Sequence, residues 1–258
     1  MKELEMMKTF ERIMQVFCAI IFVVGVVTTA NAQPASSPPT PEQEFLVSIR
    51  KGDAAKVSEL LKQHPALIKA TTTNGTSAVL LAIYSGHPEI AESLLATGIE
   101  PNIFEAAATG RLDRLRVLLD KNPELIRAYS PDGWTALHLN FGNLGVVKLL
   151  LDRGADINAV SRNGFSATPL QGAAAFKKVE LATLLIERGA NVNCRGEGGG
   201  TPLHEAAGNG QIEFAQLLLD HAANINAKDD KGKTPLTIAL ENKQTTMAKF
   251  LRSRNATQ

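Results

Sequence analysis

The motif Thr-Pro-Leu recurs at a constant spacing in the second half of this chain. It begins at Thr168, Thr201 and Thr234, and the variant Thr-Ala-Leu begins at Thr135. Successive threonines are 33 residues apart, and a constant period of this length indicates a repeat architecture. One such unit cannot bury its own apolar face, so neighbouring units have to stack into one elongated core. The period therefore predicts a solenoid.

Local signals within each unit predict two helices and a turn. Threonine is a favoured N-cap residue and proline fits the first helical turn, so a helix is expected to begin after each Thr-Pro. Gly210 suits the left-handed residue that ends this first helix, and residues 212–219, with their triple leucine, predict a second helix. Asp132-Gly133 is typical of a hairpin turn. We expect an all-α solenoid of helix-turn-helix units that are connected by short hairpins, called fingers below.

Residues 201–207, Thr-Pro-Leu-His-Glu-Ala-Ala, resemble the signature of the ankyrin repeat family, and the resemblance extends over residues 45–258. It implies stacked ankyrin repeats with short β-hairpin fingers. It also implies a structural, hydrogen-bonding role for His138 and His204. The seven expected repeats are residues 45–75, 76–102, 103–134, 135–167, 168–200, 201–233 and 234–254.

Three repeats depart from the common pattern. Residues 135–167 have two residues fewer between Thr135 and Gly154 than the sister repeats have between the corresponding positions. The first helix of that repeat, or its loop near Asn140, is therefore expected to be shortened. No Asn-Gly or Asp-Gly stands between repeats two and three, so the finger there is expected to be missing or reduced to a tight turn. The last repeat lacks a finger and is polar, as a solenoid end requires for solubility.

The first 32 residues differ from the repeats. Residues 16–27 are an unbroken apolar run, and Ala30-Asn31-Ala32 fits the cleavage site of a secretory signal peptide. We expect cleavage after Ala32 and a periplasmic or secreted protein of bacterial type. An uncleaved membrane anchor is the alternative, although the run is shorter than the roughly 20 residues that span a bilayer. Residues 33–44 are rich in proline and serine and are predicted to form an extended linker.

Charge and chemistry-bearing residues narrow the functional classes. The net charge of +1 predicts neither nucleic acid nor an anionic membrane surface as a partner. Cys194 remains alone once Cys18 leaves with the signal, so it is interpreted as a small buried side chain. Metal-ligand clusters, phosphate-binding loops and paired catalytic carboxylates are absent from the sequence. We therefore expect no cofactor, no metal ion and no enzymatic activity.

The resemblance places contacts with a partner at the finger tips and at the ends of the first helices, which line a concave groove. Aromatic side chains are favoured interface anchors, and several of the chain's aromatic residues fall there. The candidate partner-binding residues are Tyr84, Trp134, Phe165, Phe176, Glu197, Asn209, Asp230 and Lys231. Packing on the next finger is the alternative for Trp134 and Phe165.

The main hypothesis is an exported, monomeric, non-enzymatic protein that binds another protein in its concave groove. A sharper form of it is an inhibitor or immunity-like factor that covers a partner's active site. The alternative is a membrane-anchored scaffold, in which residues 16–27 are retained and residues 33–44 form a stalk; a membrane is a partner only in this case. Cleavage after Ala32 distinguishes the two. An enzyme is the third hypothesis, which turnover that survives removal of bound partners would support.

Overall fold

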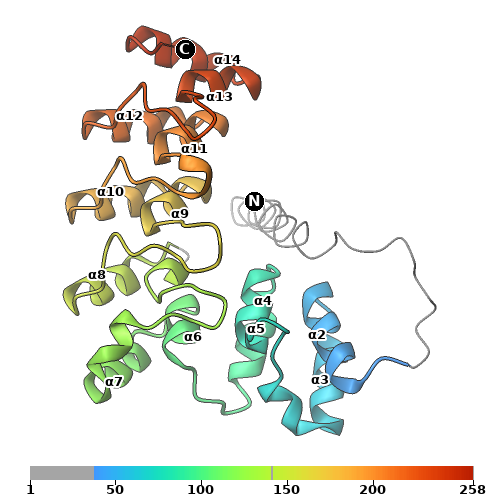
Figure 1. Cartoon of the computed structure of the whole chain (residues 1–258). Helices are drawn as coiled ribbons and strands as arrows, with labels where there is room; N and C mark the ends of the chain where they lie inside the picture. The colour runs from blue at the N-terminus through green and yellow to red at the C-terminus, as the bar shows by residue number, and fades with distance from the viewer. Residues whose placement is uncertain (1–37, 141, 258) are drawn as a thin grey trace, which may run out of the picture. The chain divides into compact units, whose positions relative to one another are not determined.

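A computed structural model describes residues 38–140 and 142–257 of the chain. Their regular elements are α-helices and short 3-10 helices (Figure 1), which confirms the predicted all-α repeat fold. No helix within these residues has the length and apolar content needed to cross a membrane. The predicted signal peptide lies outside the described residues. Two compact units divide the chain between Thr109 and Gly110, and each unit is described here by itself.

Unit 1 contains two helix pairs and one further helix. Helix α2 packs on α3 and α4, and α4 packs on α5 and α6. Phe45, Ile49 and Leu94 are fully buried between these helices. The elements are α2 (Pro41–Lys51), α3 (Ala54–Gln63), η1 (Pro65–Lys69), α4 (Ala78–Tyr84), α5 (Pro88–Leu95) and α6 (Ile103–Ala108).

The prediction that a linker extends over residues 33–44 is wrong at its C-terminal end, because α2 already begins at Pro41. Thr40 caps this helix: its hydroxyl accepts a hydrogen bond from the Gln43 N–H (3.2 Å), and the Gln43 side chain accepts one from the Thr40 N–H (2.9 Å). This reciprocal arrangement satisfies two backbone donors at the helix start. The Thr-Pro signal of the later repeats is thus present here too, within a stretch whose proline and serine content suggested a linker.

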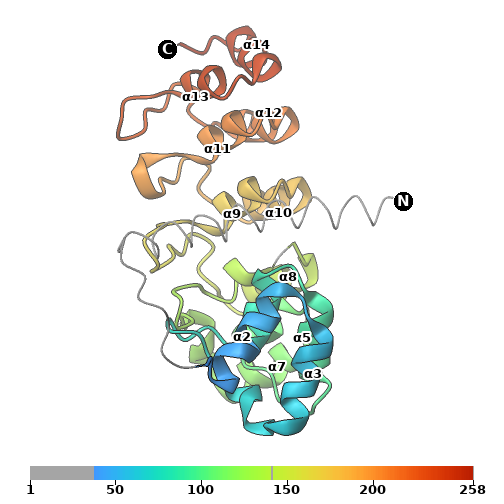
Figure 2. The same ribbon diagram turned by 90° about the vertical axis from the view of Figure 1, so that its right-hand side faces the viewer.

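Unit 2 contains the four Thr-x-Leu motifs. Its first helices α9, α11 and α13 pack side by side, and its second helices α10 and α12 form a parallel row (Figures 1 and 2). Leu170, Leu203 and Leu218 are buried between the rows. The elements are α7 (Leu112–Lys121), η2 (Pro123–Arg127), η3 (His138–Asn140), α8 (Leu144–Asp152), α9 (Pro169–Ala175), α10 (Val179–Glu187), η4 (Glu197–Gly199), α11 (Pro202–Gly208), α12 (Ile212–Asp220), α13 (Pro235–Glu241) and α14 (Thr245–Ser253).

The shortening expected near Asn140 is confirmed. The first segment of this repeat is η3, with three residues, where α9, α11 and α13 have seven each. The buried Asn140 side chain stabilises the early end of η3: its Oδ1 accepts from the Gly142 N–H (2.8 Å) and its Nδ2 donates to the Leu137 carbonyl (2.5 Å). Gly142 adopts a left-handed φ of 89°, a conformation that costs glycine little.

The fingers are tight turns with very little β-structure. Isolated antiparallel bridges join Thr71 to Ser77 and Tyr129 to Thr135. The three later fingers are closed by the backbone bonds Ser161 N to Ala167 O, Gly196 N to Gly200 O and Asp229 N to Lys233 O, each 2.9 Å long. Between α5 and α6 the finger is missing as expected, because Asn102 directly caps α6 through the Glu105 N–H (3.0 Å).

Asparagines on the loops after the second helices connect successive repeats of unit 2. The side-chain oxygen of Asn158 accepts from the Asn191 N–H, and that of Asn193 accepts from the Asn224 N–H, both at 2.8 Å. Asn226 accepts from the Thr257 N–H at 2.8 Å in the same way. A side chain one repeat earlier thus satisfies a loop amide, which ties each repeat to the next one.

Candidate protein-binding surface

Backbone hydrogen bonds join neighbouring fingers of unit 2. The Arg162 N–H donates to the Gly133 carbonyl (2.8 Å), the Glu197 N–H to the Phe165 carbonyl (3.0 Å) and the Asp230 N–H to the Gly198 carbonyl (2.9 Å). Each of these bonds crosses from one finger to the next. The side chains at the finger tips are therefore held at defined positions relative to one another rather than on independent loops.

A ring or amide side chain joins η3, α9 and α11 each to the finger that follows it. His138 Nδ1 accepts from the Thr135 N–H (3.3 Å), and its Nε2 bonds the Ala167 carbonyl at 3.0 Å. His204 makes the equivalent contacts with the Thr201 N–H (3.1 Å) and the Lys233 carbonyl (3.0 Å). Since Nδ1 accepts in both rings, Nε2 carries the proton in both. The structural role expected for the two histidines is confirmed.

Gln171 reproduces the histidine geometry with an amide. Its Oε1 accepts from the Thr168 N–H (3.0 Å) and its Nε2 donates to the Gly200 carbonyl (3.1 Å). An amide matches a neutral imidazole here because each has one acceptor and at least one donor on opposite sides. Gln171 stands where the sister repeats four and six have histidine, and it makes the same pair of bonds.

Burial disfavours the charged form of His138 and lowers its pKa from 6.5 to about 4, against the smaller opposing effects of its carbonyl hydrogen bonds and of Asp156. At neutral pH the ring is therefore uncharged, which agrees with its hydrogen bonds. The neutral ring donates its one N–H to the Ala167 carbonyl, which is the structural role described above.

Trp134 and Phe165 form an aromatic pair across two adjacent fingers. Their ring centroids are 6.2 Å apart and nearly parallel, at 12°, and Trp134 also lies 5.4 Å from the His138 ring. Trp134 thus packs on the next finger, as its alternative predicted, whereas the contact of Phe165 is with the preceding finger. Both side chains are only half-buried, so part of each ring remains at the surface. Contact with a partner stays a prediction.

The polar candidates on the fingers are exposed. Glu197 begins η4, and Asp230 and Lys231 lie at the tip of the next finger. Asp230 is held by Arg195, whose Nη2 donates to its Oδ1 at 2.9 Å, while Nη1 of the same guanidinium donates to the Lys228 carbonyl at 2.8 Å. The carboxylate of Asp230 therefore has a fixed orientation at the surface.

The candidates at the helix ends lie in different surroundings. Asn209 is exposed after α11 and its amide donates to Glu205 Oε1 (2.7 Å). Phe176 is half-buried after α9. Tyr84 ends α4 in unit 1, with its hydroxyl buried, and the other seven candidates belong to unit 2. The structure therefore groups seven of the eight candidates in one unit.

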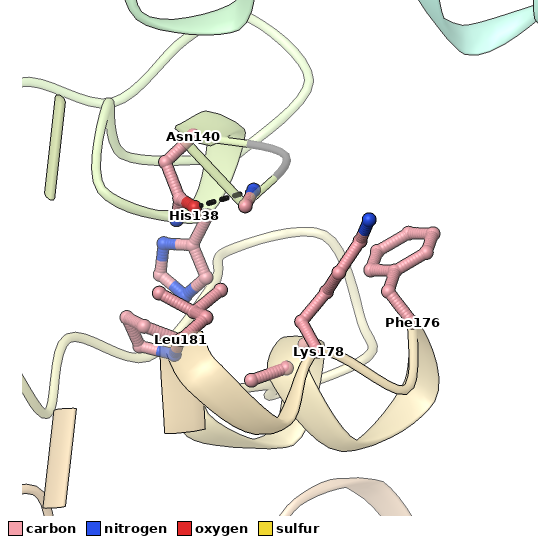
Figure 3. A pocket seen from close by; sticks show the side chains of 9 residues that line it. His138, Asn140, Phe176, Lys178 and Leu181 are labelled. Carbon is pink, nitrogen blue, oxygen red and sulfur yellow. Dashed lines mark hydrogen bonds between the residues drawn. The ribbon is translucent and has the colours of Figure 1, made fainter. Parts of the chain in front are cut away.

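A small recess lies beside the short segment η3. Figure 3 shows Lys178 and Phe176 extending side by side next to the turn at Asn140, with His138 and Leu181 at the other end. The lining also includes Gly142, Pro169, Gly172 and Ala173. Lys178 and Asn140 were not among the sequence candidates. The two-residue deficit of this repeat was the available signal, since it shows where a first helix is too short to fill its place.

Two further features concern candidate metal ligands and the thiol of Cys194. Among the described residues, no group of three or more His, Cys, Asp or Glu side chains converges as metal ligands would. Cys194 is buried, with its sulfur 3.1 Å from the Thr168 hydroxyl, and burial raises the pKa of its thiol. A buried, protonated thiol is inert, which fits the interpretation as a packing residue.

Family models and individual relatives agree with the repeat pattern. The model for an ankyrin repeat matches residues 132–162, and the model for ankyrin repeats in three copies matches residues 170–258. An NAD-capped RNA hydrolase of Pongo abelii is 37% identical over 78 residues, or 29% of this chain and 17% of the relative. An E3 ubiquitin-protein ligase of Oryza sativa subsp. japonica is 38% identical over 103 residues, or 39% of this chain and 22% of the relative.

A putative ankyrin repeat protein of Fowlpox virus aligns over a longer stretch, 166 residues at 27% identity, which is 60% of this chain and 37% of the relative. The chain thus spans about a fifth of the two enzymes and little more than a third of the viral protein. The similarity is to their repeats and not to whole proteins. The repeat period, the hydrogen bonds of His138, Gln171 and His204 to the next finger, and the two family matches all agree. This chain belongs to the ankyrin repeat family, whose repeats are protein–protein interaction modules.

Proposed function

We propose that this chain is a non-enzymatic protein-binding module that contacts its partner with the finger tips of unit 2 and the adjacent ends of the first helices. The hydrogen-bonded row of fingers carries the proposal, because it presents Trp134, Phe165, Glu197 and Asp230 in fixed positions. A pre-organised surface loses less entropy on binding than flexible loops do. Aromatic side chains are also enriched at interface centres, and polar side chains such as those of Glu197 and Asp230 are typical of the surrounding rim.

We further propose export followed by cleavage after Ala32, which makes the partner a periplasmic or secreted protein. The apolar run and the small-residue cleavage motif support this step. An inhibitor or immunity-like factor is one form of such binding, and the identity of the partner decides it.

Site-specific crosslinking in the host tests the binding surface. A photo-crosslinking amino acid replaces Asp230 at a finger tip in one variant, and Glu213 in a matched variant. Both positions are exposed, but Glu213 lies in the first turn of second helix α12. We expect one protein to be crosslinked from position 230 and not from position 213. Equal crosslinking from both positions, or from neither, would contradict the proposed surface.

The N-terminus of the same purified chain tests export. A mature terminus at Gln33 in the periplasmic or extracellular fraction supports cleavage. An intact Met1 or Met7 terminus in the membrane fraction would instead support the membrane-anchored scaffold.

A further inference from the structure

The recess beside η3 exists because one first helix is too short. Its lining comes from η3 and the turn after it and from α9 and α10, and η3 has three residues where α9 has seven. The recess has a volume of about 20 Å³, which is enough for one water-sized group. A single carboxylate oxygen matches this size, whereas a whole aromatic ring does not.

Lys178 has an unusual identity for its position. It is the N-cap residue of α10, and the corresponding N-caps of α12 and α14 are Gln211 and Gln244. Both glutamines reach back to the preceding repeat: Gln211 Nε2 donates to the Ala174 carbonyl (2.9 Å) and Gln244 Nε2 to the Gly208 carbonyl (3.2 Å). Among the described residues Lys178 forms no such bond to the preceding repeat, and its aliphatic stem lies against Gly142 instead. Figure 3 shows its side chain extending beside the ring of Phe176.

The charge of Lys178 is not compensated within the described part of unit 2. The ion pairs there join Asp113 to Arg116, Glu124 to Arg127, Asp120 to Arg153, Asp152 to Arg188, Asp230 to Arg195 and Glu241 to Lys233. Neither Lys178 nor the exposed Lys177 beside it takes part. Lys178 therefore lines a small recess without a carboxylate partner among the described residues.

The other polar groups of the recess are already engaged. His138 spends its single N–H on the Ala167 carbonyl, and Asn140 donates to the Leu137 carbonyl. Lys178 brings a charged donor to this lining, and the ring of Phe176 beside it offers an apolar wall (Figure 3). This combination suits an acidic side chain, whose methylene stem packs on the ring while its carboxylate meets the ammonium group.

We propose that this recess is an anchor for a Glu or Asp side chain of the partner protein, with Lys178 as the charge-pairing residue. This inference rests on the proposed protein-binding function, and it adds the chemistry of one contact. Charge complementarity carries it, because an uncompensated ammonium group at a partly desolvated site attracts an anion more strongly than a fully solvated one does.

The test uses the full chain and a displayed library of random 12-residue peptides. Peptides selected on the wild-type chain are resynthesised, each also with its acidic residue changed from Glu to Gln, and their affinities are measured by calorimetry. The variant Lys178→Gln carries the residue of the sister repeats, so we expect it to fold, and a thermal melt checks this. Lys243→Gln is the matched control, since Lys243 lies in the sister turn before α14.

We expect the selected peptides to be enriched in Glu or Asp over the input library. Lys178→Gln should weaken their binding roughly three- to tenfold, the range of a partly exposed charge-assisted contact, and the Glu→Gln peptides should lose the same factor on the wild type but nothing more on the variant. Lys243→Gln should change little.

Two other outcomes are distinct. Peptides that bind Lys178→Gln as tightly as the wild type, or that show no acidic enrichment, overturn the anchor while leaving the binding function intact. Failure to select any peptide, together with no crosslink from position 230, counts against both proposals.

Discussion

Repeats four and six begin alike and end differently. Both start with Thr-x-Leu-His, and in both the histidine bonds the threonine amide and a carbonyl of the next finger at about the same distances. The first segment of repeat four nevertheless stops at Asn140, whereas α11 continues to Gly208. The start of a first helix is thus set by four local residues. Its end is set by how many residues remain before the second helix has to begin.

The difference also changes the surface. In repeat six, the side chain of the N-cap residue Gln211 contacts the preceding repeat, because it donates a hydrogen bond to the Ala174 carbonyl. At the step between repeats four and five, the short η3 leaves a recess, and Lys178 stands beside it. A deficit of two residues, which costs local packing, therefore creates the feature to which we assign a binding role.

The largest effect is expected from truncating the motif leucines. Leu203 of α11 and Leu137 before η3 are 0% and 1% exposed, so Leu203→Ala and Leu137→Ala should each lower the free energy of unfolding by about 2–5 kcal/mol. Urea denaturation followed by circular dichroism measures both. A loss near zero for Leu137→Ala would show that repeat four does not pack as its sister does.

The second effect is a pH dependence that belongs to His138. Because its pKa falls from 6.5 in the unfolded chain to about 4 in the folded chain, the unfolded state binds more protons between these values. The contribution of His138 to the free energy of unfolding is fully present above pH 6.5. It is lost as the pH falls towards 4, by roughly 3 kcal/mol in all. Below pH 4 this group causes no further loss.

His138→Gln isolates that contribution, since Gln171 makes the same two bonds without titrating. Plots of the free energy of unfolding against pH for the wild type and the variant should run in parallel above pH 6.5 and converge or cross below it. Curves with a constant separation from pH 7 to 4 would show that His138 is not desolvated.

A smaller effect is expected for the aromatic pair, which repeat six lacks. Trp134→Ala removes a half-buried ring that stacks on Phe165 and His138, and we expect a loss of roughly 1–2 kcal/mol. A double-mutant cycle with Phe165→Ala should give a coupling energy of about 0.5–1.5 kcal/mol. A coupling near zero would mean that the rings touch without contributing, and both would then be free to serve a partner.

The smallest effect is expected when the start of the first segment in repeat four is made identical to that in repeat six. Ala136→Pro introduces the proline of the sister motifs at the first helical position, and it should raise the stability by about 0.4–1 kcal/mol by restricting the unfolded chain. Thermal unfolding of the variant measures it. A destabilised variant would show that the backbone at position 136 differs from that at Pro202.

Much of the fold could be predicted because its signals are local. Thr caps and Pro at helix starts placed α9, α11 and α13, and the count from Thr135 to Gly154 showed that one first helix is short. Left-handed glycines follow α10 and α11, whereas Lys177, Ala222 and Lys243 take that conformation after α9, α12 and α13. The Thr40-Pro41 start was missed because composition was weighed over the cap. The equivalence of Gln171 to histidine was not predicted, because it lies in hydrogen-bond geometry and not in residue type.

The candidate site was predicted less well. Phe176 and the finger residues followed from position, but Lys178 and Asn140 were missed, and the Trp134–Phe165 stack remained one of two options. Each of these features joins residues of neighbouring repeats, 31 to 38 positions apart in the sequence. A local motif carries no information about which side chain of the next repeat meets it.

By itself, the sequence determined the repeat, its period, the helix starts and the shortened helix, since capping and backbone conformation depend on residues within a few positions of one another. The tertiary structure alone decided which aromatic rings stack, which imidazole loses its solvent and where an ammonium group remains without a counter-charge. Those outcomes depend on desolvation and packing between repeats, which exist only once the repeats have stacked.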